Sequence, residues 1–535
     1  MQRNIEQLQR TTYDLLVIGG GINGAAIAHL AAKRGMKVAL LEKGDFASGT
    51  SSKSTKLIHG GIRYLENLEV DLVYESLRER HIQLTVAPHL VKPLPFVIPV
   101  YEGDKRPLWM MQLGVFLYDL LAGRYRVKPR KNLTREEVIQ LEPGIEQKGL
   151  KGGVLYYDAQ MDDARLCLEN VLMAAQYGAH VANYVKAVFF VKENGRVTGV
   201  RARDLLEEQV RSGTGPLSLQ GPVPIKNGHE FQVRAKRVIC AAGPWTNELL
   251  RLDIPNAKKK VRTTKGIHVV YKGEISKHAI LIGSQSDRRI FFVIPWMGNS
   301  LIGTTDTDYS ASPDKVKVEQ KDIDYLIRES RRVFPAIGFS LSKILATFAG
   351  LRPLIRKGGS PSKVSRKHLF YASQSGVIFV VGGKYTTYRK VAEDCMNRIQ
   401  GSGSILALKK WCLTPLFLCP PCDFSVYGSG AMSETADAAA ARSGLEREVV
   451  QSLMDFYGSR YKDVLALIEK DPSLKEKVSE NPLVIKAQLV YSVETEMART
   501  MEDITERRLS LVFRGPVSAK ALAAISEICA EAARK

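Results

Sequence analysis

The chain has 535 residues, of which 45% are apolar and 25% are charged. These proportions are typical of soluble globular proteins, and they exclude bulk disorder, collagen-like repeats and a protein with many membrane spans. Lysine and arginine number 77 against 56 acidic residues, which is a formal net charge of +21. This surplus favours an anionic partner, such as a phosphorylated metabolite, a nucleic acid or an acidic membrane surface. The alternative is a basic surface without a specific partner. Seven cysteines are too few for a disulfide scaffold, and a reducing, cytoplasmic setting is expected.

The N-terminal part predicts a βαβ unit of a parallel sheet. Residues 13–18 form a continuous apolar run, which is typical of a strand buried on both faces. Three glycines follow, and residues 23–34 have the alanine-rich pattern of a helix. A second apolar run over residues 37–41 ends at Glu42. Strand, tight turn, helix and strand therefore follow one another over a short stretch of chain.

Residues 19–24 match the dinucleotide-binding pattern Gly-x-Gly-x-x-Gly. Gly19 permits the tight turn, Gly21 lets the backbone approach a pyrophosphate, and Gly24 lets the helix and strand pack closely. The helix N-terminus offers free N–H groups to the phosphates. Glu42 can accept hydrogen bonds from a ribose. The pattern predicts an ADP moiety, but it does not distinguish FAD from NAD.

Later segments predict a mixed set of helices and strands. We expect a helix over 68–87, an extended proline-containing stretch over 88–107 and a hairpin with its turn at 193–195. Further strands are expected over 233–242, 261–271, 279–282, 290–303 and 377–381, the last followed by a helix through Arg398.

Residues 401–430 are rich in Gly, Ser and Pro and predict a linker, and residues 431–535 have a helical pattern. Cys412, Cys419 and Cys422 lie in that linker. No histidine follows His368, so a zinc site is not expected there, and no metal is expected elsewhere.

The segment 51–64 is dense in hydrogen-bond donors and small residues. We expect it near the carboxyl edge of the sheet, where α/β folds bind ligands and where a backbone free of large side chains can approach a flat ring.

The chain resembles the FAD-dependent glycerol-3-phosphate dehydrogenases. The resemblance is carried by blocks that keep one order over roughly residues 13–398, whereas 205–230 and 401–430 match poorly. The blocks are residues 17–24, 50–52, 56–65, 161–166, 242–245, 293–296, 302–306, 350–354 and 382–390. The stretch 496–502 also resembles that family's C-terminal domain in kind.

The resemblance implies a mixed α/β and α+β architecture. A Rossmann-type FAD-binding domain would be assembled within 13–400 from about 13–100, 155–260 and 340–400. An antiparallel-sheet substrate-capping domain would use about 100–155 and 260–340, and a helical C-terminal domain would follow. The implied reaction oxidises sn-glycerol 3-phosphate to dihydroxyacetone phosphate and passes electrons to membrane quinone. The implied location is peripheral, on the inner face of the cell membrane, and a homodimer is one alternative for the oligomeric state.

The substrate phosphate calls for cations, and arginine suits it because a planar guanidinium makes paired hydrogen bonds. Arg63, Arg352 and Arg389 lie in the family-like blocks and are the candidates. For taking the hydroxyl proton we expect His268 or His59, since histidine titrates near neutral pH. Tyr64, Thr305 and Asp306 are candidate polar wall residues.

The remaining expected cofactor residues come from several segments. Lys384 could neutralise reduced flavin, and Thr386 and Thr387 could present backbone N–H groups to it or could cap the following helix. The others, besides Gly19, Gly21, Gly24, Glu42 and His59, are Asn23, Lys43, Thr50, Ser51, Ser52, Lys56, Leu57, Gly60, Gly61, Val188, Ala242, Gly243, Trp245 and Gly383.

Residues 109–123 are apolar and lie between two basic clusters. This pattern indicates either an interfacial anchor on an anionic membrane or a buried core helix. Three other functions remain as alternatives: an oxidase that uses oxygen, an RNA-binding flavoprotein, and an amine or amino-acid oxidase. Nucleic-acid binding is not expected, because aromatic residues do not interleave with the basic ones.

Overall fold

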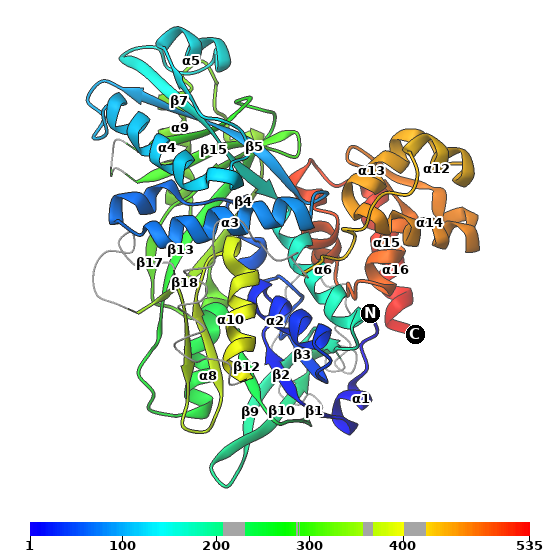
Figure 1. Ribbon diagram of the computed structural model, residues 1–535. Helices are drawn as coiled ribbons and strands as arrows, with labels where there is room; N and C mark the ends of the chain where they lie inside the picture. The colour runs from blue at the N-terminus through cyan, green and yellow to red at the C-terminus, as the bar shows by residue number, and fades with distance from the viewer. Residues whose placement is uncertain (207–229, 285–286, 288, 357–366, 401–423, 535) are drawn as a thin grey trace.

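The computed structural model describes residues 1–206, 230–284, 287, 289–356, 367–400 and 424–534. Figure 1 shows three regions: a sheet region with α4 and α5 at its top, a second sheet region with β1, β9 and β10 at its bottom, and a helical region coloured orange to red on its right. The segment 205–230, which matches the family poorly, lies almost entirely outside the described residues. The three cysteines of the expected linker also lie outside them.

The region that has β1, β9 and β10 at its bottom in Figure 1 is built on a six-stranded sheet in the order β19-β20-β12-β2-β3-β8. Strands β20, β12, β2, β3 and β8 run parallel, and β19 pairs antiparallel with β20. The strands are β2 (Leu15–Ile18), β3 (Val38–Leu41), β8 (His180–Ala182), β12 (Val238–Cys240), β19 (His368–Ala372) and β20 (Ile378–Gly382). This is the expected Rossmann-type sheet, assembled from distant pieces of chain.

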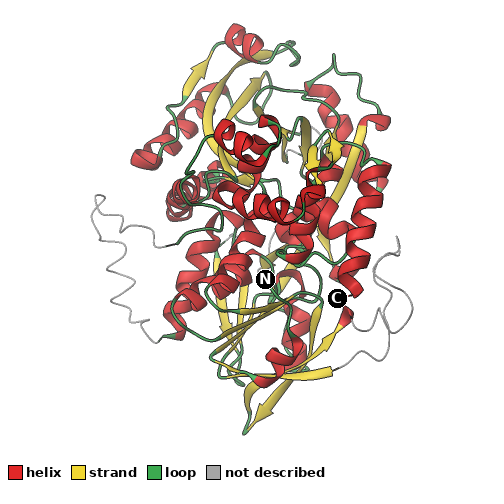
Figure 2. Ribbon diagram, turned by 90° about the vertical axis from the view of Figure 1, so that its right-hand side faces the viewer, coloured by secondary structure: helices red, strands yellow, loops and turns green. Residues whose placement is uncertain are grey.

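Strand β2 shows why this sheet is buried on both faces. Leu15 and Val17 pack into the cluster formed with the helices, while Leu16 and Ile18 face a second sheet. Side chains alternate along a strand, so four consecutive apolar residues supply both layers. The helices on the first face are α2 (Ile22–Lys33), α6 (Asp163–Gln176) and α10 (Tyr388–Ile399). Figure 2 shows the lower part of the molecule from the side, with red helices beside the yellow strands.

A four-stranded sheet covers the other face, in the order β1-β11-β10-β9. Its strands are β1 (Thr12–Tyr13), β9 (Val185–Glu193), β10 (Arg196–Asp204) and β11 (Glu230–Ala235). The hairpin turn between β9 and β10 is made by Asn194 and Gly195, both with positive φ, as the sequence predicts.

The capping region is a ten-stranded mixed sheet, centred on β13 (Val261–Tyr271) and on β5 (Val91–Tyr101) with β7 (Leu150–Met161). The other strands are β4 (Leu57–Ile58), β6 (Lys131–Leu133), β14 (Ala279–Gly283), β15 (Ile290–Trp296), β16 (Asn299–Gly303), β17 (Thr307–Tyr309) and β18 (Ile344–Ile355). Strand pairing crosses the boundaries expected between the two regions. β4 and β5 begin before residue 100, β7 continues past residue 155, and β18, which lies beyond residue 340, pairs with β13 along its whole length. Long-range strand pairing decides these boundaries, and no local pattern reports it.

Helices pack on this sheet and differ in how much they bury. They are α3 (Val70–Val86), α4 (Leu108–Ala122), α5 (Arg135–Leu141) and α9 (Gln320–Val333). α4 buries only Val115, Tyr118 and Ala122. Trp109, Met110, Leu113, Phe116, Leu117 and Leu120 remain 41–64% exposed, so the buried-core interpretation of residues 109–123 fails for this face of the helix. No helix in the described part of the chain is long and apolar enough to cross a membrane.

The C-terminal region is mostly helical, as expected. It contains α12 (Ala436–Ser443), α13 (Arg447–Tyr457), α14 (Tyr461–Lys470), α15 (Lys486–Glu494) and α16 (Ala519–Arg534), with a small hairpin of β21 (Lys477–Glu480) and β22 (Leu483–Ile485). A π-helical turn, η11 (Asp503–Arg508), separates α15 from α16. Within the expected linker, Phe424 and Val426 are buried in the core beside α2 and α10, so this end of the segment is packed.

Candidate cofactor and substrate site

One cavity of about 2120 Å³ joins the six-stranded sheet to the capping sheet. Gly19 and Glu42 line one part of it, and His59, His268 and Arg352 line another. Pockets for drug-sized ligands have volumes of about 300–1,000 Å³. This cavity therefore has room for a dinucleotide together with a small substrate.

The glycine turn is shaped for close approach. Gly19 has φ +110°, a conformation that favours glycine. A Cβ at Gly24 would overlap the carbonyl oxygen of Gly19, so Gly24 lets α2 pack against β2. Gly21 precedes the first residue of α2, and the Ile22 N–H donates to Ser51 Oγ at 2.9 Å. Ser51 therefore already sits at the helix N-terminus where phosphate is expected to bind.

Glu42 ends β3 beside this turn. Its carboxylate accepts hydrogen bonds from the Gly20 N–H at 2.6 Å and the Gly44 N–H at 2.8 Å. Burial raises the pKa of Glu42 above its ordinary value, and these two hydrogen bonds act in the opposite direction. The side chain is thus held against the turn, in the position from which a ribose-binding acidic residue acts.

Lys43 and Trp245 form a cluster on the cavity wall with Asp314 of the capping region. Lys43 Nζ lies 2.6 Å from Asp314 Oδ1 and 4.3 Å from the Trp245 ring centroid. The Trp245 Nε1–H donates to Asp314 at 2.8 Å. These contacts join the two regions beside the cofactor end of the cavity.

His59 lies next to Gly60, whose N–H donates at 3.3 Å to the carboxylate of a buried polar group centred on Asp158. The Asp158 carboxylate accepts from the Tyr118 hydroxyl at 2.8 Å and from Arg80 at 2.5 Å. Burial lowers the pKa of His59 to about 4, although Asp158 opposes that shift and Lys384 adds to it. His59 is therefore neutral at pH 7 and can accept a proton.

His268 lies in β13 and is almost fully buried. Its Nε2 is 3.0 Å from Thr55 Oγ1, and its ring stacks on Phe348 with centroids 4.9 Å apart. Burial lowers the pKa of His268 well below its ordinary value, and the positive charges of Arg352 and Lys56 add to that. Its Nδ1 has no hydrogen-bond partner among the described residues.

Arg352 reaches the same wall from β18, opposite Thr264 of β13. Its guanidinium donates to Thr304 Oγ1 at 2.8 Å and to the Thr305 carbonyl at 3.1 Å, and it lies 3.2 Å from Asp306 Oδ1. A Cβ at Gly266 would overlap this guanidinium, so the glycine leaves the space that Arg352 occupies.

Three further residues that the sequence indicated for the site lie close together near the start of α10. Lys384 Nζ donates to Ser76 Oγ at 2.9 Å and lies 4.0 Å from the Tyr64 ring centroid. Thr386 Oγ1 accepts from the His59 N–H at 3.2 Å. Lys384, Tyr64 and Thr386 thus form one wall with the segment that carries His59 and Arg63.

The cavity brings together most of the residues that the sequence indicated. Those on its wall are Gly19, Gly21, Asn23, Glu42, Lys43, Thr50, Ser51, Leu57, His59, Gly61, Arg63, Tyr64, Val188, Ala242, Gly243, Trp245, His268, Asp306, Arg352, Gly383, Lys384 and Thr386. Those behind the wall are Gly24, Ser52, Lys56, Gly60, Thr305, Thr387 and Arg389.

Lys56 and Arg389 are the clearest departures. Lys56 Nζ lies 2.5 Å from Asp163 Oδ1 and donates to the Ser52 carbonyl at 2.8 Å. Arg389 is buried against Glu79, with one contact of 2.6 Å, and also pairs with Glu393. Each of these cationic side chains is paired with protein carboxylates, because burying an unpaired charge would be costly.

Sequence reasoning missed several wall residues. Thr55 lies in the donor-rich segment 51–64 expected near the ligand but is not among the named candidates, and Asp158 lies outside the family-like blocks. Thr500, Glu502 and Arg507 reach the cavity from the C-terminal region. Thr500 and Glu502 lie in the stretch 496–502, which resembles the family's C-terminal domain, but no pattern there indicated contact with the cavity. Among the described residues, no cluster of His, Cys, Asp and Glu could hold a metal ion.

The fold and this cavity define a dinucleotide-dependent oxidoreductase. The family model described as FAD-dependent oxidoreductase matches residues 14–389, which is most of the chain, and the model described as the C-terminal domain of alpha-glycerophosphate oxidase matches 422–534. The chain is 39% identical to a glycerol-3-phosphate dehydrogenase from Synechocystis over 96% of this chain and 91% of the relative. It therefore belongs to the FAD-dependent glycerol-3-phosphate dehydrogenase family.

Two more comparisons agree. An aerobic glycerol-3-phosphate dehydrogenase from Bacillus subtilis is 35% identical over 96% of this chain and 89% of the relative. The crystal structure of the glycerol-3-phosphate dehydrogenase from Bacillus halodurans complexed with FAD superposes with a TM-score of 0.76 at 30% identity. That match covers 98% of this chain and 92% of the other.

The residues present fit FAD as the cofactor. The close approach at Gly21, the carboxylate of Glu42 and the unpartnered Asn23 Oδ1 lie at the end expected for the ADP part. The cavity continues from there to the wall formed by His59, Lys384 and His268. An extended cofactor with its ring system at that wall would use both ends.

Proposed function

We propose that this protein oxidises sn-glycerol 3-phosphate to dihydroxyacetone phosphate. The proposal is supported by one observation above all: a single cavity connects the glycine turn to a wall of arginines and neutral histidines. The relatives named above act on the same substrate according to their names. When bound, FAD supplies the oxidant that removes the hydride from the carbon bearing the hydroxyl group.

Arg63 and Arg352 are the proposed phosphate ligands. Arg63 lines the cavity, and its guanidinium has no hydrogen bond or ion pair with another described residue. Arg352 is oriented by Thr304, Thr305 and Asp306, so its guanidinium has a defined direction. Two guanidinium groups can share the phosphate oxygens and orient the three-carbon chain. Lys384 adds a third positive charge on the same wall.

The proposed proton acceptor is a histidine. His268 is our first candidate, because it lines the cavity and its ring is held by Phe348 and Thr55. His59 is the second, with Asp158 close enough to stabilise its protonated form. Both imidazoles are neutral at pH 7 and can accept a proton, but burial lowers the pKa of each and so makes it a weaker base than an exposed histidine.

For the electron acceptor we propose a membrane quinone. Phe96, Tyr156, Leu281, Ile290 and Phe292 give another part of the cavity wall an apolar character. A quinone ring suits such a wall, whereas oxygen would not need it. The C-terminal match to an oxidase domain makes oxygen the alternative.

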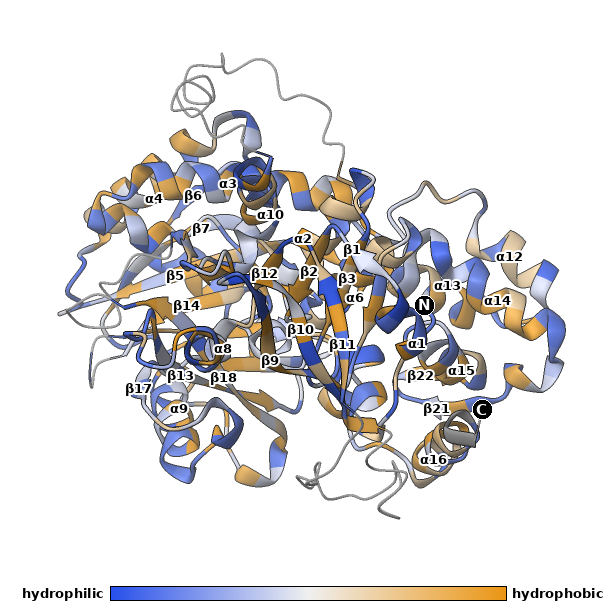
Figure 3. Ribbon diagram, turned by 90° about the horizontal axis from the view of Figure 1, so that it is seen from below, coloured by the Kyte–Doolittle hydropathy of each residue, from blue (hydrophilic) through white to orange (hydrophobic). Residues whose placement is uncertain are grey.

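For location we propose the inner face of the cell membrane, with α4 as the contact. Trp109, Leu113, Phe116 and Leu120 are 44–64% exposed on this helix. Figure 3 shows the orange, apolar segments of α4 at the edge of the molecule. Basic residues flank it on both sides at Lys105, Arg106, Arg124, Arg126, Lys128, Arg130 and Lys131. An apolar face with a basic border suits the surface of an anionic bilayer.

The experiment is a visible spectrum of the purified protein under anaerobic conditions. We expect an oxidised flavin spectrum that bleaches on addition of sn-glycerol 3-phosphate but not of glycerol or inorganic phosphate. A spectrum that persists with sn-glycerol 3-phosphate would exclude the proposed substrate. Adding a soluble quinone analogue should restore the oxidised spectrum faster than air does, and stoichiometric peroxide with slow quinone reduction would favour the oxidase.

A further inference from the structure

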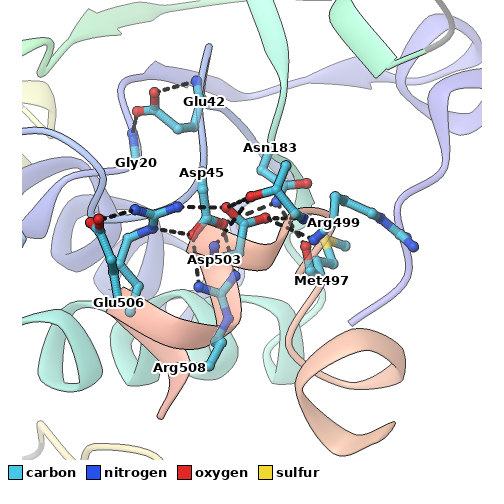
Figure 4. A network of polar contacts seen from close by, with 12 residues as sticks. Gly20, Glu42, Asp45, Asn183, Met497, Arg499, Asp503, Glu506 and Arg508 are labelled. Carbon is cyan, nitrogen blue, oxygen red and sulfur yellow. Dashed lines mark hydrogen bonds and ion pairs between the residues drawn. The ribbon is translucent and has the colours of Figure 1, made fainter. Parts of the chain in front are cut away.

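A buried network of charges connects the C-terminal region to the cofactor end of the cavity (Figure 4). Its centre is Asp45, three residues beyond Glu42. The Asp45 carboxylate accepts from Arg507 Nε at 2.7 Å and from both terminal nitrogens of Arg508 at 2.8 Å. Asp45 and Arg508 are fully buried, and Arg507 nearly so. Arg508 makes the paired, planar contact that only arginine offers to a carboxylate.

Both arginines are also held from the C-terminal side. Arg507 Nη2 donates to Asp503 Oδ1 at 2.6 Å, one turn earlier in η11. Arg508 Nη2 donates to the Glu496 carbonyl at 2.9 Å. The Asp503 carboxylate in turn accepts from the Arg499 N–H at 2.7 Å and from the Tyr184 hydroxyl at 2.7 Å. The C-terminal region therefore fixes the orientation of both guanidinium groups that contact Asp45.

The loop that carries Asp45 forms part of the cofactor site. Gly44, the residue before Asp45, donates its N–H to Glu42. The Ala47 N–H donates to the Gly20 carbonyl at 3.1 Å, which ties the loop to the glycine turn. Ala47 has a left-handed φ of +64°, so this loop is bent in a way that an alanine does not favour. Its shape depends on partners outside the loop.

We propose that Arg507 and Arg508 are positioning residues of the FAD site, which hold the loop from Glu42 to Gly49 through Asp45. The C-terminal region thereby sets the affinity for the adenosine half of FAD. Arg507 also lines the cavity itself, beside Thr500 and Glu502. This positioning role concerns the binding of FAD alone and does not depend on the substrate proposed above.

The first test compares FAD affinity with stability in full-length variants. Asp45→Asn and Arg507→Gln should raise the dissociation constant of FAD at least tenfold, measured by flavin titration of FAD-stripped protein. The matched control is Asp322→Asn, another buried carboxylate, which accepts from Lys265 Nζ at 2.7 Å in the capping region and lies off the cavity wall. Arg507→Lys should recover part of the lost affinity, because it retains the positive charge.

The Tm of the FAD-stripped proteins separates positioning from a general structural role. If Asp45→Asn and Asp322→Asn lower Tm similarly and only the former weakens FAD, the proposal holds. An unchanged dissociation constant in both Asp45→Asn and Arg507→Gln overturns it, and so does a weakening of equal size in Asp322→Asn.

The second test needs no variant and remains decisive if Asp45→Asn does not fold. Coupling between two sites is reciprocal, so FAD must stabilise the segment that stabilises its site. Adding FAD to the stripped wild-type protein should slow amide hydrogen exchange at least threefold in residues 499–508 as well as in 19–52. Protection confined to 19–52 overturns the proposal.

Discussion

At the scale of single residues, the site depends on which guanidinium groups are left without a protein carboxylate. Arg63 and Arg389 both lie in family-like blocks, yet Arg63 lines the cavity and Arg389 is neutralised by Glu79. Arg352 is intermediate, since one of its contacts is the carboxylate of Asp306 and two are neutral oxygens. A guanidinium with neutral partners retains most of its attraction for a phosphate.

Arg352→Ala tests the phosphate assignment. Hydrogen bonds between charged groups contribute about 1.5–3 kcal/mol, so we expect kcat/KM for sn-glycerol 3-phosphate to fall roughly 100-fold. The flavin spectrum and FAD content should not change, because Arg352 lies away from Glu42 and the glycine turn. Arg328→Ala, at an exposed position of α9, is the control and should retain wild-type kinetics. Wild-type kinetics in Arg352→Ala would remove this residue from the site.

At the scale of elements, the packing of α2 against α6 encloses a histidine. His29 Nδ1 lies 3.2 Å from Asn170 Oδ1, and the ring contacts Phe424 with centroids 4.4 Å apart. Burial lowers the pKa of His29 to about 4, while its hydrogen bond to Asn170 opposes this. The folded protein thus resists protonation of His29 in a range where the unfolded chain takes up a proton.

The consequence is a stability that depends on pH. The pKa of His29 is lower in the folded state than the ordinary 6.5, so its contribution is complete above pH 6.5 and is lost as pH falls toward 4. At about 1.4 kcal/mol per tenfold ratio, the loss would reach about 3 kcal/mol. In His29→Gln, the free energy of unfolding, measured by denaturant titration, should fall less between pH 6.5 and pH 4 than in the wild type.

The comparison contains its own control. Between pH 8 and pH 9 the histidine is neutral in both states, so the difference between the two proteins should stay constant there. Parallel curves down to pH 4 would show that protonation of His29 does not oppose folding.

At the scale of the whole molecule, the proposed membrane contact combines the net charge of +21 with the exposed face of α4. In this proposal the charge would attract the protein to anionic lipid from a distance, and the apolar side chains would add short-range binding. We expect the wild type to bind vesicles of phosphatidylcholine with phosphatidylglycerol more strongly than phosphatidylcholine alone, and more weakly as salt rises. Trp109→Ser combined with Leu120→Ser should reduce binding to the mixed vesicles at least tenfold in a sedimentation assay.

Leu341→Ser is the matched control for these vesicles. Leu341 is 55% exposed, comparable to Trp109 and Leu120, but lies outside α4. The Leu341→Ser variant should bind the vesicles as strongly as the wild type does. Equal binding by the α4 double variant, or binding insensitive to both salt and lipid charge, would contradict α4 as the membrane contact.

The amino-acid sequence by itself determined the local parts of this protein. The glycine turn, Glu42 at the end of β3 and the hairpin at Asn194 and Gly195 follow from rules that act over a few residues. They could be predicted because close backbone approach and positive φ restrict the residue type at each position. The order of the motifs also indicated the family and FAD.

The tertiary structure alone decided which side chains meet. Arg389 was expected at the substrate and pairs with Glu79, and Lys56 was expected at the cofactor and pairs with Asp163. The sequence patterns at Asp45 and Arg508, far apart in the chain, did not indicate that they form a buried pair. The direction of a side chain depends on the helices and strands packed around it, and a buried charge is stable only where that packing supplies a partner.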